Sequence, residues 1–523
     1  MALPRNVLRI LEDIVGPENI SDEPVVLDTY AFQYLAETVT GTKFCARPGA
    51  VVLPGSTEEV QAIVKTCNRY RVKFKALSTG WGVWNTVGGE GTIQLDLRRM
   101  NRILDIDDKN MYAVVEPYVI GAQLQVEAMK RGLNCHIIGA GANFSPLASC
   151  TSMVGHGLSG IFMGFSARNP LAVEWVLPTG DILRLGSLGS GAGWFCGDGP
   201  GPSLRGIMRG FMGAMGGMGV FTKCAVKLYP WPGPPVLQIE GLTPEYTTSV
   251  PDNFRFYALA FPNWDRFADA AYKIAEAEIG YVMGRQLPPG LVPLLLVRSS
   301  AEYAQTRQSG MADELMQEFR HAFLLVLAGS SLREIEYQEK ALKEILAETE
   351  GRIPSLTQDP EIEKTGFSFL VKGDRNGLIF KLAGTFHTSF GAATAWDAAV
   401  AGAKTGEELK KKYIEKGVIV DDAADAAWGG LYEQGRFGHL EELFMYDPSD
   451  PESAKGAVEY LAEADEAVLQ RSLGQPLGAL PNQAAGVYGP ACFNYQDWMR
   501  RIKKAFDPNV ASDPSFYIEP EES

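Results

Sequence analysis

The stretch that most constrains the fold is a glycine-rich loop between two short apolar strands, within residues 74–101. We expect one strand at residues 74–77 and the next at residues 92–97, with several glycines between them. Glycine and other small residues leave backbone N–H groups unshielded, so that several can turn toward one anion, most often a diphosphate. From this loop alone, a glycine-rich turn without a ligand explains the pattern equally well.

Length and charge limit the class of protein. A chain of 523 residues is too long for a single hydrophobic core, and we expect two or three domains. The net charge of −15 argues against nucleic acid as a partner, because phosphate binding needs clustered Lys and Arg. No apolar run approaches the roughly 20 residues of a membrane span. The N-terminus lacks the apolar segment of a signal peptide and predicts an ordinary first helix.

Cysteine and histidine usage argues against several kinds of site. The seven cysteines are scattered and never form a Cys-x-x-Cys pair, which suits a reducing cytoplasm and excludes an iron–sulfur cluster held by this chain alone. The five histidines include no HExxH motif, and neither a P-loop motif nor a GxSxG motif occurs. Zinc protease, P-loop and α/β-hydrolase interpretations therefore lose their usual support, and we predict no metal site.

Two further stretches of small residues follow, at residues 139–160 and 210–227. Residues 155–160 match GxGxxG, but a dinucleotide-binding Rossmann motif needs a strand directly before the glycines and a helix directly after them. Here the preceding residues are small and polar, and the following segment soon breaks, so we reject that match. The third stretch runs into an alternating strand that ends at four prolines within residues 230–235, where we place a domain boundary.

The remaining chain predicts a second α+β domain. In the first domain, Ser56 and Glu59 form a capping box that predicts a helix to about Tyr70. After about residue 236 the sequence changes, and long amphipathic helices alternate with strands. We expect one sheet covered by helices. The expected helices are residues 264–279, 332–349, 406–416 and 451–473, the expected strands are residues 254–261, 294–299, 321–327 and 440–446, and a last helix covers residues 495–506.

Four blocks in this order resemble the FAD-binding domain of the vanillyl-alcohol oxidase (para-cresol methylhydroxylase) superfamily. The blocks are residues 47–60, 77–104, 172–183 and 215–232. Near the C-terminus the family usually closes on Asn-Pro-Gly, where this chain has Ser512-Asp513-Pro514. The resemblance implies a two-part α+β FAD-binding domain at residues 1–234, an α+β cap (substrate) domain at 235–475, and a segment at 476–523 that returns to the FAD domain.

The resemblance also implies which residues bind FAD. The pyrophosphate loop, the segment beside the flavin and a third strand supply these residues, mainly through backbone donors, which need no lysine. Many relatives attach FAD covalently through a histidine in the pyrophosphate loop, where this chain has none, so we expect non-covalent FAD, with His387 as the alternative attachment point. His156 is either a flavin-facing residue or a plain loop residue. The implied FAD-binding residues are Ser78, Thr79, Gly80, Trp81, Gly82, Asn85, Ser152, Val154, Gly155, Gly160, Gly219, Val220 and Thr222.

The cap supplies the candidate catalytic residues. Flavin oxidation of an alcohol needs a group that takes the hydroxyl proton, for which an imidazole is suited, and an Arg would anchor a carboxylate. His439, Arg436, His387 and Glu441 are the candidates. The segment at residues 437–448 resembles glycolate/D-lactate-type dehydrogenases but lacks their Gly-Asp-Gly-Asn core, which puts their metal site in doubt. Alternatively, His439 is a core histidine, and Arg436 and Glu441 form a solvated ion pair.

These observations predict an FAD-dependent oxidoreductase that oxidises a CH–OH group of a hydroxy acid or aromatic alcohol by hydride transfer to flavin N5. Trp428 and Tyr432 could line an aromatic pocket or serve packing. Electrons would pass to a partner protein or to oxygen, and the sequence leaves a homo-oligomer open. The alternative is a non-catalytic flavin-fold subunit that scaffolds a larger redox complex.

Overall fold

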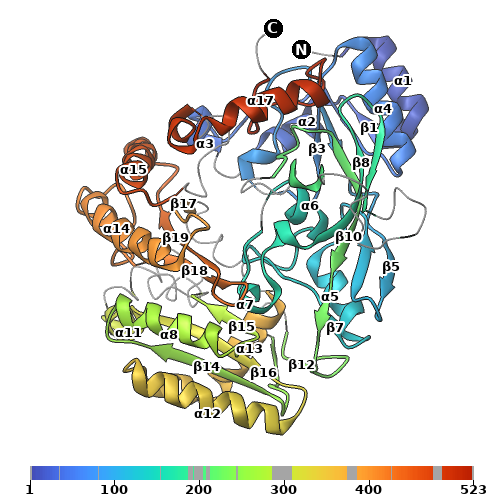
Figure 1. Ribbon diagram of the computed structural model, residues 1–523. Coiled ribbons are helices and arrows are strands. Elements are labelled where there is room, and N and C mark those ends of the chain that lie inside the picture. The colour runs from blue at the N-terminus through green and yellow to red at the C-terminus, as the bar shows by residue number, and fades with distance from the viewer. Residues whose placement is uncertain are drawn as a thin grey trace.

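The computed structural model describes residues 3–33, 36–80, 82–153, 155–186, 193, 204–207, 213–242, 246–285, 305, 309–373, 386–425, 427–474 and 486–520. Figure 1 shows two bodies, one built from the blue to green elements of the first 234 residues, up to strand β10, and one from the green to red-orange elements that follow. We call the second body, residues 235–474, the cap. The last helix, α17 (Tyr495–Phe506), returns to the first body.

The glycine-rich loop lies in a four-stranded sheet at the N-terminal end of the first body. The strand order is β1-β2-β4-β3, and β2, β4 and β3 run parallel. The capping box is confirmed, because the Ser56 hydroxyl accepts the Glu59 N–H at 3.2 Å and opens helix α4. Bounds are α1 (Arg5–Val15), β1 (Ile20–Ser21), α2 (Pro24–Ala31), α3 (Ala36–Thr40), β2 (Ala50–Val52), α4 (Thr57–Tyr70), β3 (Phe74–Leu77), η2 (Gly82–Asn85) and β4 (Ile93–Asp96).

The second half of the first body is an antiparallel five-stranded sheet of order β5-β6-β10-β8-β9. Its outer hairpin, β8 and β9, turns at residues 177–181 as the sequence predicted. Among the described residues, the element before the GxGxxG segment is the helix Pro146–Thr151 rather than a strand, and only a four-residue helix, Gly160–Met163, begins at its last glycine, which supports rejecting a Rossmann motif. Bounds are β5 (Ile103–Asp107), β6 (Tyr112–Val115), α5 (Gly121–Met129), β7 (Leu133–Asn134), α6 (Pro146–Thr151), α7 (Gly160–Met163), β8 (Pro170–Val176), β9 (Ile182–Leu185) and β10 (Val220–Lys227).

The cap holds two three-stranded sheets rather than the single sheet that we expected. Their orders are β14-β16-β15 and β17-β19-β18. Backbone bonds between Arg285 and Gly429 join them edge to edge, and a Cβ on Gly284 would come within 2.5 Å of the Gly429 carbonyl oxygen. Gly284 and Gly429 therefore allow the edges of the two sheets to approach closely. The pattern of apolar residues in the sequence does not reveal this contact. The strand expected at residues 294–299 lies outside the described residues.

Helices cover both cap sheets, and three of the four predicted ones begin at the expected residue. The exception is α14, which starts ten residues earlier than predicted because its first half is rich in alanine rather than visibly amphipathic. Bounds are β14 (Phe254–Ala260), α8 (Trp264–Glu276), β15 (Val282–Gly284), α11 (Met311–Phe319), β16 (Ala322–Ala328), α12 (Leu332–Glu348), α13 (Pro360–Lys372), β17 (Phe386–Phe390), α14 (Trp396–Glu415), β18 (Ala427–Tyr432), β19 (Phe437–Met445) and α15 (Pro451–Gln470).

The C-terminal segment after α17 packs along β3 of the first body. The Phe74 N–H donates to the Ala511 carbonyl at 2.9 Å, and the Asp513 N–H donates back to Phe74 at 2.9 Å. Asp513 also accepts the Gly88 N–H at 2.6 Å. The residues that depart from the family's usual ending therefore hold the glycine-rich loop.

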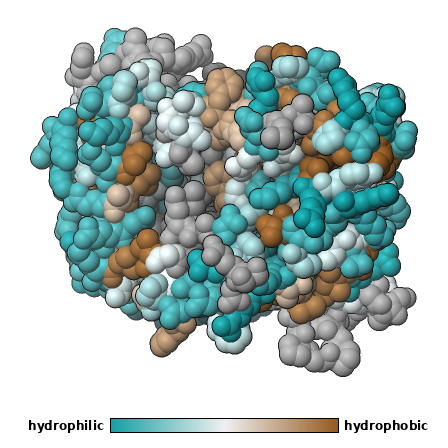
Figure 2. Space-filling model, turned by 90° about the horizontal axis from the view of Figure 1, so that it is seen from above, coloured by the Kyte–Doolittle hydropathy of each residue, from teal (hydrophilic) through white to brown (hydrophobic). Residues whose placement is uncertain are grey.

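The face in Figure 2 is mainly hydrophilic, with separate hydrophobic patches. Within the described ranges, no helix is both long enough and apolar enough to cross a membrane.

Candidate functional site

A large cavity lies between the glycine-rich segments of the first body and one sheet of the cap. Its empty space, open mouth included, is about 1610 Å³. Three segments of the first body meet there, around residues 75–85, 138–156 and 215–221, and β17, β18 and β19 contribute the cap wall. The cavity thus collects the three small-residue stretches that the sequence singled out.

Two side-chain contacts fix the start of the glycine-rich loop. The Ser78 hydroxyl donates to the Pro117 carbonyl, and the Thr79 hydroxyl accepts the Ser145 N–H at 3.2 Å. Gly80 has a φ of +81°, a left-handed conformation that favours glycine. Residues 78–80 therefore line the cavity in a conformation that these contacts hold.

The other two segments also bring backbone close to the cavity. A Cβ on Gly155 would come within 2.1 Å of the Ile138 Cγ2 atom, and one on Gly139 would overlap the Trp428 ring at 1.9 Å. Gly219 has a φ of +86°, and its N–H donates to the Ser512 hydroxyl at 2.8 Å. A larger side chain at Gly139 or Gly155 would collide with residues of the cavity wall.

Most of the cofactor-binding residues implied by the resemblance line this cavity, namely Ser78, Thr79, Gly80, Asn85, Ser152, Gly155 and Gly219. Trp81 and Val154 lie outside the described residues, and Gly82 begins η2 (Gly82–Asn85).

Gly160, Val220 and Thr222 are placed elsewhere. Gly160 accepts the Glu433 N–H at 2.9 Å and lies under the Tyr432 ring, so it joins the two bodies instead of facing the cavity. Val220 packs in the sheet core, and the Thr222 hydroxyl donates to the buried Glu174. Because strand residues alternate between faces, Phe221 between them reaches the cavity instead.

The cap end of the cavity is set by the alternation of β19. Glu441 and Leu443 line the cavity from one face of the strand, together with Trp428 and Thr388 of the neighbouring strands. His439 shares that face, is fully buried, and its Nε2 lies 3.3 Å from Glu441 Oε2. Two of the predicted catalytic candidates, His439 and Glu441, therefore lie in contact, with Glu441 in the cavity wall and His439 behind it.

His156 completes this cluster from the first body. Its ring stacks on that of His439 with centroids 4.3 Å apart and planes 8° from parallel. Burial, with repulsion from His439 and His136, lowers the pKa of His156 well below its usual range. His156 is therefore neutral near pH 7 and lines the cavity, which favours the flavin-facing interpretation over a plain loop residue.

Arg436 and His387 lie away from the cavity. Arg436 is exposed in the turn between β18 and β19, so it forms neither a carboxylate anchor at the cavity nor an ion pair with the buried Glu441. His387 precedes Thr388 on β17 and points to the opposite face, where it stacks on Phe444 at 5.8 Å. The structure therefore gives no support to His387 as the flavin attachment point.

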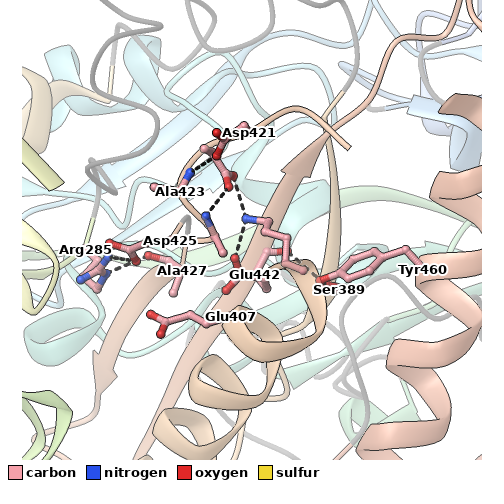
Figure 3. A network of polar contacts seen from close by, with 12 residues as sticks. Arg285, Ser389, Glu407, Asp421, Ala423, Asp425, Ala427, Glu442 and Tyr460 are labelled. Carbon is pink, nitrogen blue, oxygen red and sulfur yellow. Dashed lines mark hydrogen bonds and ion pairs between the residues drawn. The ribbon is translucent and has the colours of Figure 1, made fainter. Parts of the chain in front are cut away.

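A buried ionic network lies on the far face of β19. Lys410 of α14 donates to Asp422 at 2.7 Å and to Glu442 at 2.6 Å, and all three side chains are fully buried. Burial raises the pKa of Glu442 to about 8, although Lys410 opposes the shift. Figure 3 shows Glu442 in this network and, nearby, Asp425 facing Arg285 at 2.7 Å. Adjacent acids on one strand thus have different roles, Glu441 at the cavity and Glu442 in the fold.

Sequence reasoning missed Lys75, Trp84, Ile138 and Ser145 in the wall. Lys75 is the one cationic side chain among the described lining residues, and its amine lies 3.3 Å from the Ser515 carbonyl oxygen. Burial lowers its pKa to about 8, because Asp513 only partly compensates. A lysine within an expected apolar strand carries no local signal of this position; only the packing of the C-terminal segment creates it.

The lining suits a flavin dinucleotide. Five glycines and four serines supply small side chains and backbone along the first body, and narrow spaces at Gly155 and Gly139 exclude even a methyl group. Within the described parts of the chain, no group of three or more His, Cys, Asp or Glu residues is arranged to hold a metal ion.

The chain has the fold of the vanillyl-alcohol oxidase type, and its first body contains an FAD-binding domain. Residues 48–186 match the family described as "FAD binding domain". The overall fold matches that of p-cresol methylhydroxylase with substrate bound (TM-score 0.74, 19% identity, covering 98% of this chain and 96% of that one). It also matches 4-ethylphenol oxidase from Gulosibacter chungangensis in an isoeugenol complex (TM-score 0.71, 19% identity, 99% and 97% covered). The resemblance drawn from the sequence is confirmed.

The curated relatives are similar over part of the chain. The glycolate oxidase subunit GlcD of Bacillus subtilis is 29% identical over 234 residues, which cover 44% of this chain and 46% of GlcD. A probable mitochondrial D-lactate dehydrogenase of Danio rerio is 29% identical over 242 residues, covering 45% and 42%. The chain therefore matches less than half the length of these relatives. FAD is the cofactor that this domain binds.

Proposed function

We propose that the chain is an FAD-dependent oxidoreductase that oxidises a CH–OH group of a small substrate, with hydride transfer to flavin N5 and onward transfer of electrons to a partner protein or oxygen. One observation carries the proposal: the cavity of the FAD-binding domain ends at a buried acid on the cap, Glu441. Bound FAD would supply the two-electron acceptor. The first body would hold it through Ser78, Thr79, Gly80 and Gly155.

Glu441 is the residue that takes the hydroxyl proton in this proposal. Its side chain lines the cavity, and the nearest ring nitrogen of His439 lies 3.3 Å from its Oε2 atom. That contact fixes the carboxyl orientation, because His439 is itself held between the stacked His156 ring and the edge of Trp428 at 5.8 Å. A proton acceptor held in place in this way contributes about 10²–10⁴ to the rate of such steps.

The cap wall favours a neutral aromatic alcohol over a hydroxy acid. Trp428 and Leu443 give it apolar surface, Thr388 a hydroxyl and Glu441 a carboxyl group. An anionic substrate would approach Glu441 with like charge, and the cation proposed for it, Arg436, is exposed in a turn. We therefore place phenolic or benzylic alcohols first and 2-hydroxy acids, suggested by the curated relatives, second.

Anaerobic addition of substrates to the purified protein tests the proposal. We expect 4-hydroxybenzyl alcohol to bleach the flavin absorption and D-lactate to bleach it slowly or not at all. Bleaching by D-lactate alone would overturn the order of substrates. A flavin that resists both classes of substrate would favour the non-catalytic scaffold subunit.

A further inference from the structure

Hydrogen bonds connect the end of the chain to the cavity wall. Residues 503–517, which we call the C-terminal arm, comprise the last residues of α17 and the segment that packs along β3. The arm contacts two of the three glycine-rich segments, residues 78–91 and 215–221. Because both segments supply residues to the cavity wall, the arm reaches the cavity through them.

Ser512 and Lys503 hold the second of these segments. The Ser512 hydroxyl accepts the Gly219 N–H at 2.8 Å and donates to the Gly216 carbonyl at 3.2 Å. The Lys503 amine donates to the Gly217 carbonyl at 2.6 Å and to the Ser512 carbonyl at 2.9 Å. Gly216 and Gly219 both line the cavity, so these bonds fix the backbone directly at its wall.

Asp513 holds the first segment, the glycine-rich loop at residues 78–91. Its carboxylate accepts the Gly88 N–H at 2.6 Å, and its own N–H donates to the Phe74 carbonyl at 2.9 Å. A Cβ on Gly88 would lie 2.3 Å from the Ser515 Cβ atom, so the loop and the arm are in direct contact. The same short arm therefore holds two segments that lie far apart in the sequence.

The three side chains of the arm act on a ligand through the glycines. Lys503 and Ser512 are 0% exposed and Asp513 is 3% exposed, so they present almost no surface to a bound molecule. Glycine backbone loses more conformational freedom than other backbone when it is fixed. A ligand that must itself fix such backbone binds more weakly than one that meets it already fixed. Bonds that hold the glycines in place therefore raise the affinity for the ligand.

We propose that the C-terminal arm positions the backbone of both segments for FAD, so that docking of the arm and binding of FAD stabilise each other. Lys503, Ser512 and Asp513 are positioning residues in this proposal. The resemblance assigns none of them to the FAD site, and its usual Asn-Pro-Gly ending is replaced here at residues 512–514. The inference requires FAD in the cavity but does not depend on the oxidation proposed above.

The test compares Ser512→Ala and Asp513→Ala, made separately, with the control Thr57→Val. The Thr57 hydroxyl donates to the buried Glu174 at 2.7 Å, so the control also removes a buried hydrogen bond from the first body. Affinity for FAD is measured by titrating protein from which the flavin has been removed. The thermal midpoint without FAD reports how much each change destabilises the fold. Hydrogen–deuterium exchange of the wild type is followed with and without FAD.

We expect Ser512→Ala and Asp513→Ala each to weaken FAD binding about three- to ten-fold, because each leaves a glycine N–H unpaired and its segment less fixed. Thr57→Val should weaken FAD binding by less than about two-fold, even where it lowers the thermal midpoint equally. Coupling is reciprocal, so FAD should slow deuterium exchange in the arm by a larger factor than in α12 of the cap.

The inference is overturned if no folded arm variant loses more than about two-fold in FAD affinity, if the control causes an equal loss, or if FAD leaves exchange in the arm unchanged. The two arm variants act on different segments, so either one decides the question if the other does not fold. A wild type that binds no FAD would overturn this inference and the proposed function together. A wild type that binds FAD but is bleached by no substrate would overturn the proposed function alone.

Discussion

Replacing Lys410 by Met should destabilise the protein by an amount that depends on pH. Lys410→Met keeps most of the side-chain volume but leaves Asp422 buried without a cation, 0% exposed. At pH 7 the folded variant avoids an unpaired buried charge at the lowest free-energy cost by protonating Asp422. Each pH unit above the ordinary carboxyl pKa of 3.8 adds about 1.4 kcal/mol to that cost, which sets an upper limit of about 4.4 kcal/mol at pH 7 and about 1.6 kcal/mol at pH 5, because burial already raises the pKa of Asp422 in the wild type. Glu442 adds little, since its pKa of about 8 leaves it mostly protonated at pH 7.

Urea unfolding followed by tryptophan fluorescence at pH 5 and pH 7 measures this difference. The matched control is Lys404→Met on the same helix, whose partner Asp265 is 82% exposed and which should change stability by less than about 0.5 kcal/mol. An equal loss at both pH values, or a loss at pH 7 no larger than that of the control, would refute the reasoning. Because Glu442 neighbours Glu441 on β19, Lys410→Met should also impair the cavity wall.

Three further changes test the site. Glu441→Gln should lower kcat about 10²–10⁴-fold while flavin absorption of the purified protein stays normal; unchanged kcat would exclude Glu441 as the proton acceptor. Gly155→Ala places a Cβ 2.1 Å from Ile138 and should reduce the flavin content of the purified protein, whereas Gly89→Ala, with open space around it, should not. Lys75 has a folded-state pKa of about 8, below its ordinary 10.5, so the unfolded chain binds more protons between these values. The flavin-free wild type should therefore gain stability from pH 8 to 10.5 relative to Lys75→Met, and parallel pH curves would contradict this.

Local patterns predicted the elements of the first body well. Strand periodicity, the Ser56 capping box and three stretches of small residues are properties of consecutive residues, and the structure confirms them. The glycines were informative because close contacts, such as that of Gly155 with Ile138, tolerate no Cβ. These parts of the fold depend little on distant chain segments.

The cap site could be predicted only in part. Alternate residues of a strand face opposite sides of the sheet, and the sequence does not show which side faces the cavity. Glu441 and Glu442 are equivalent in the sequence, yet one lines the cavity and the other binds Lys410. His387 and Thr388 differ in the same way. Arg436 was misjudged because its neighbours form a tight turn, which carries it to the surface.

Contacts between segments far apart in the chain could not be predicted from local sequence patterns. Lys75 enters the cavity wall only because residues 511–516 pack along β3, more than 400 positions away in the chain. Gly160 faces the cap because Tyr432 lies over it. Both placements follow from how distant segments meet, and a single sequence does not encode them visibly.

The central claim is that FAD fills the cavity between the first body and the cap without a covalent link. The visible absorption spectrum of the purified protein, repeated on the supernatant after acid precipitation, tests it most directly. We predict a flavin spectrum that moves entirely into the supernatant. Colour that stays with the precipitate would contradict the non-covalent attachment, and a colourless protein that takes up no added FAD would contradict the account as a whole.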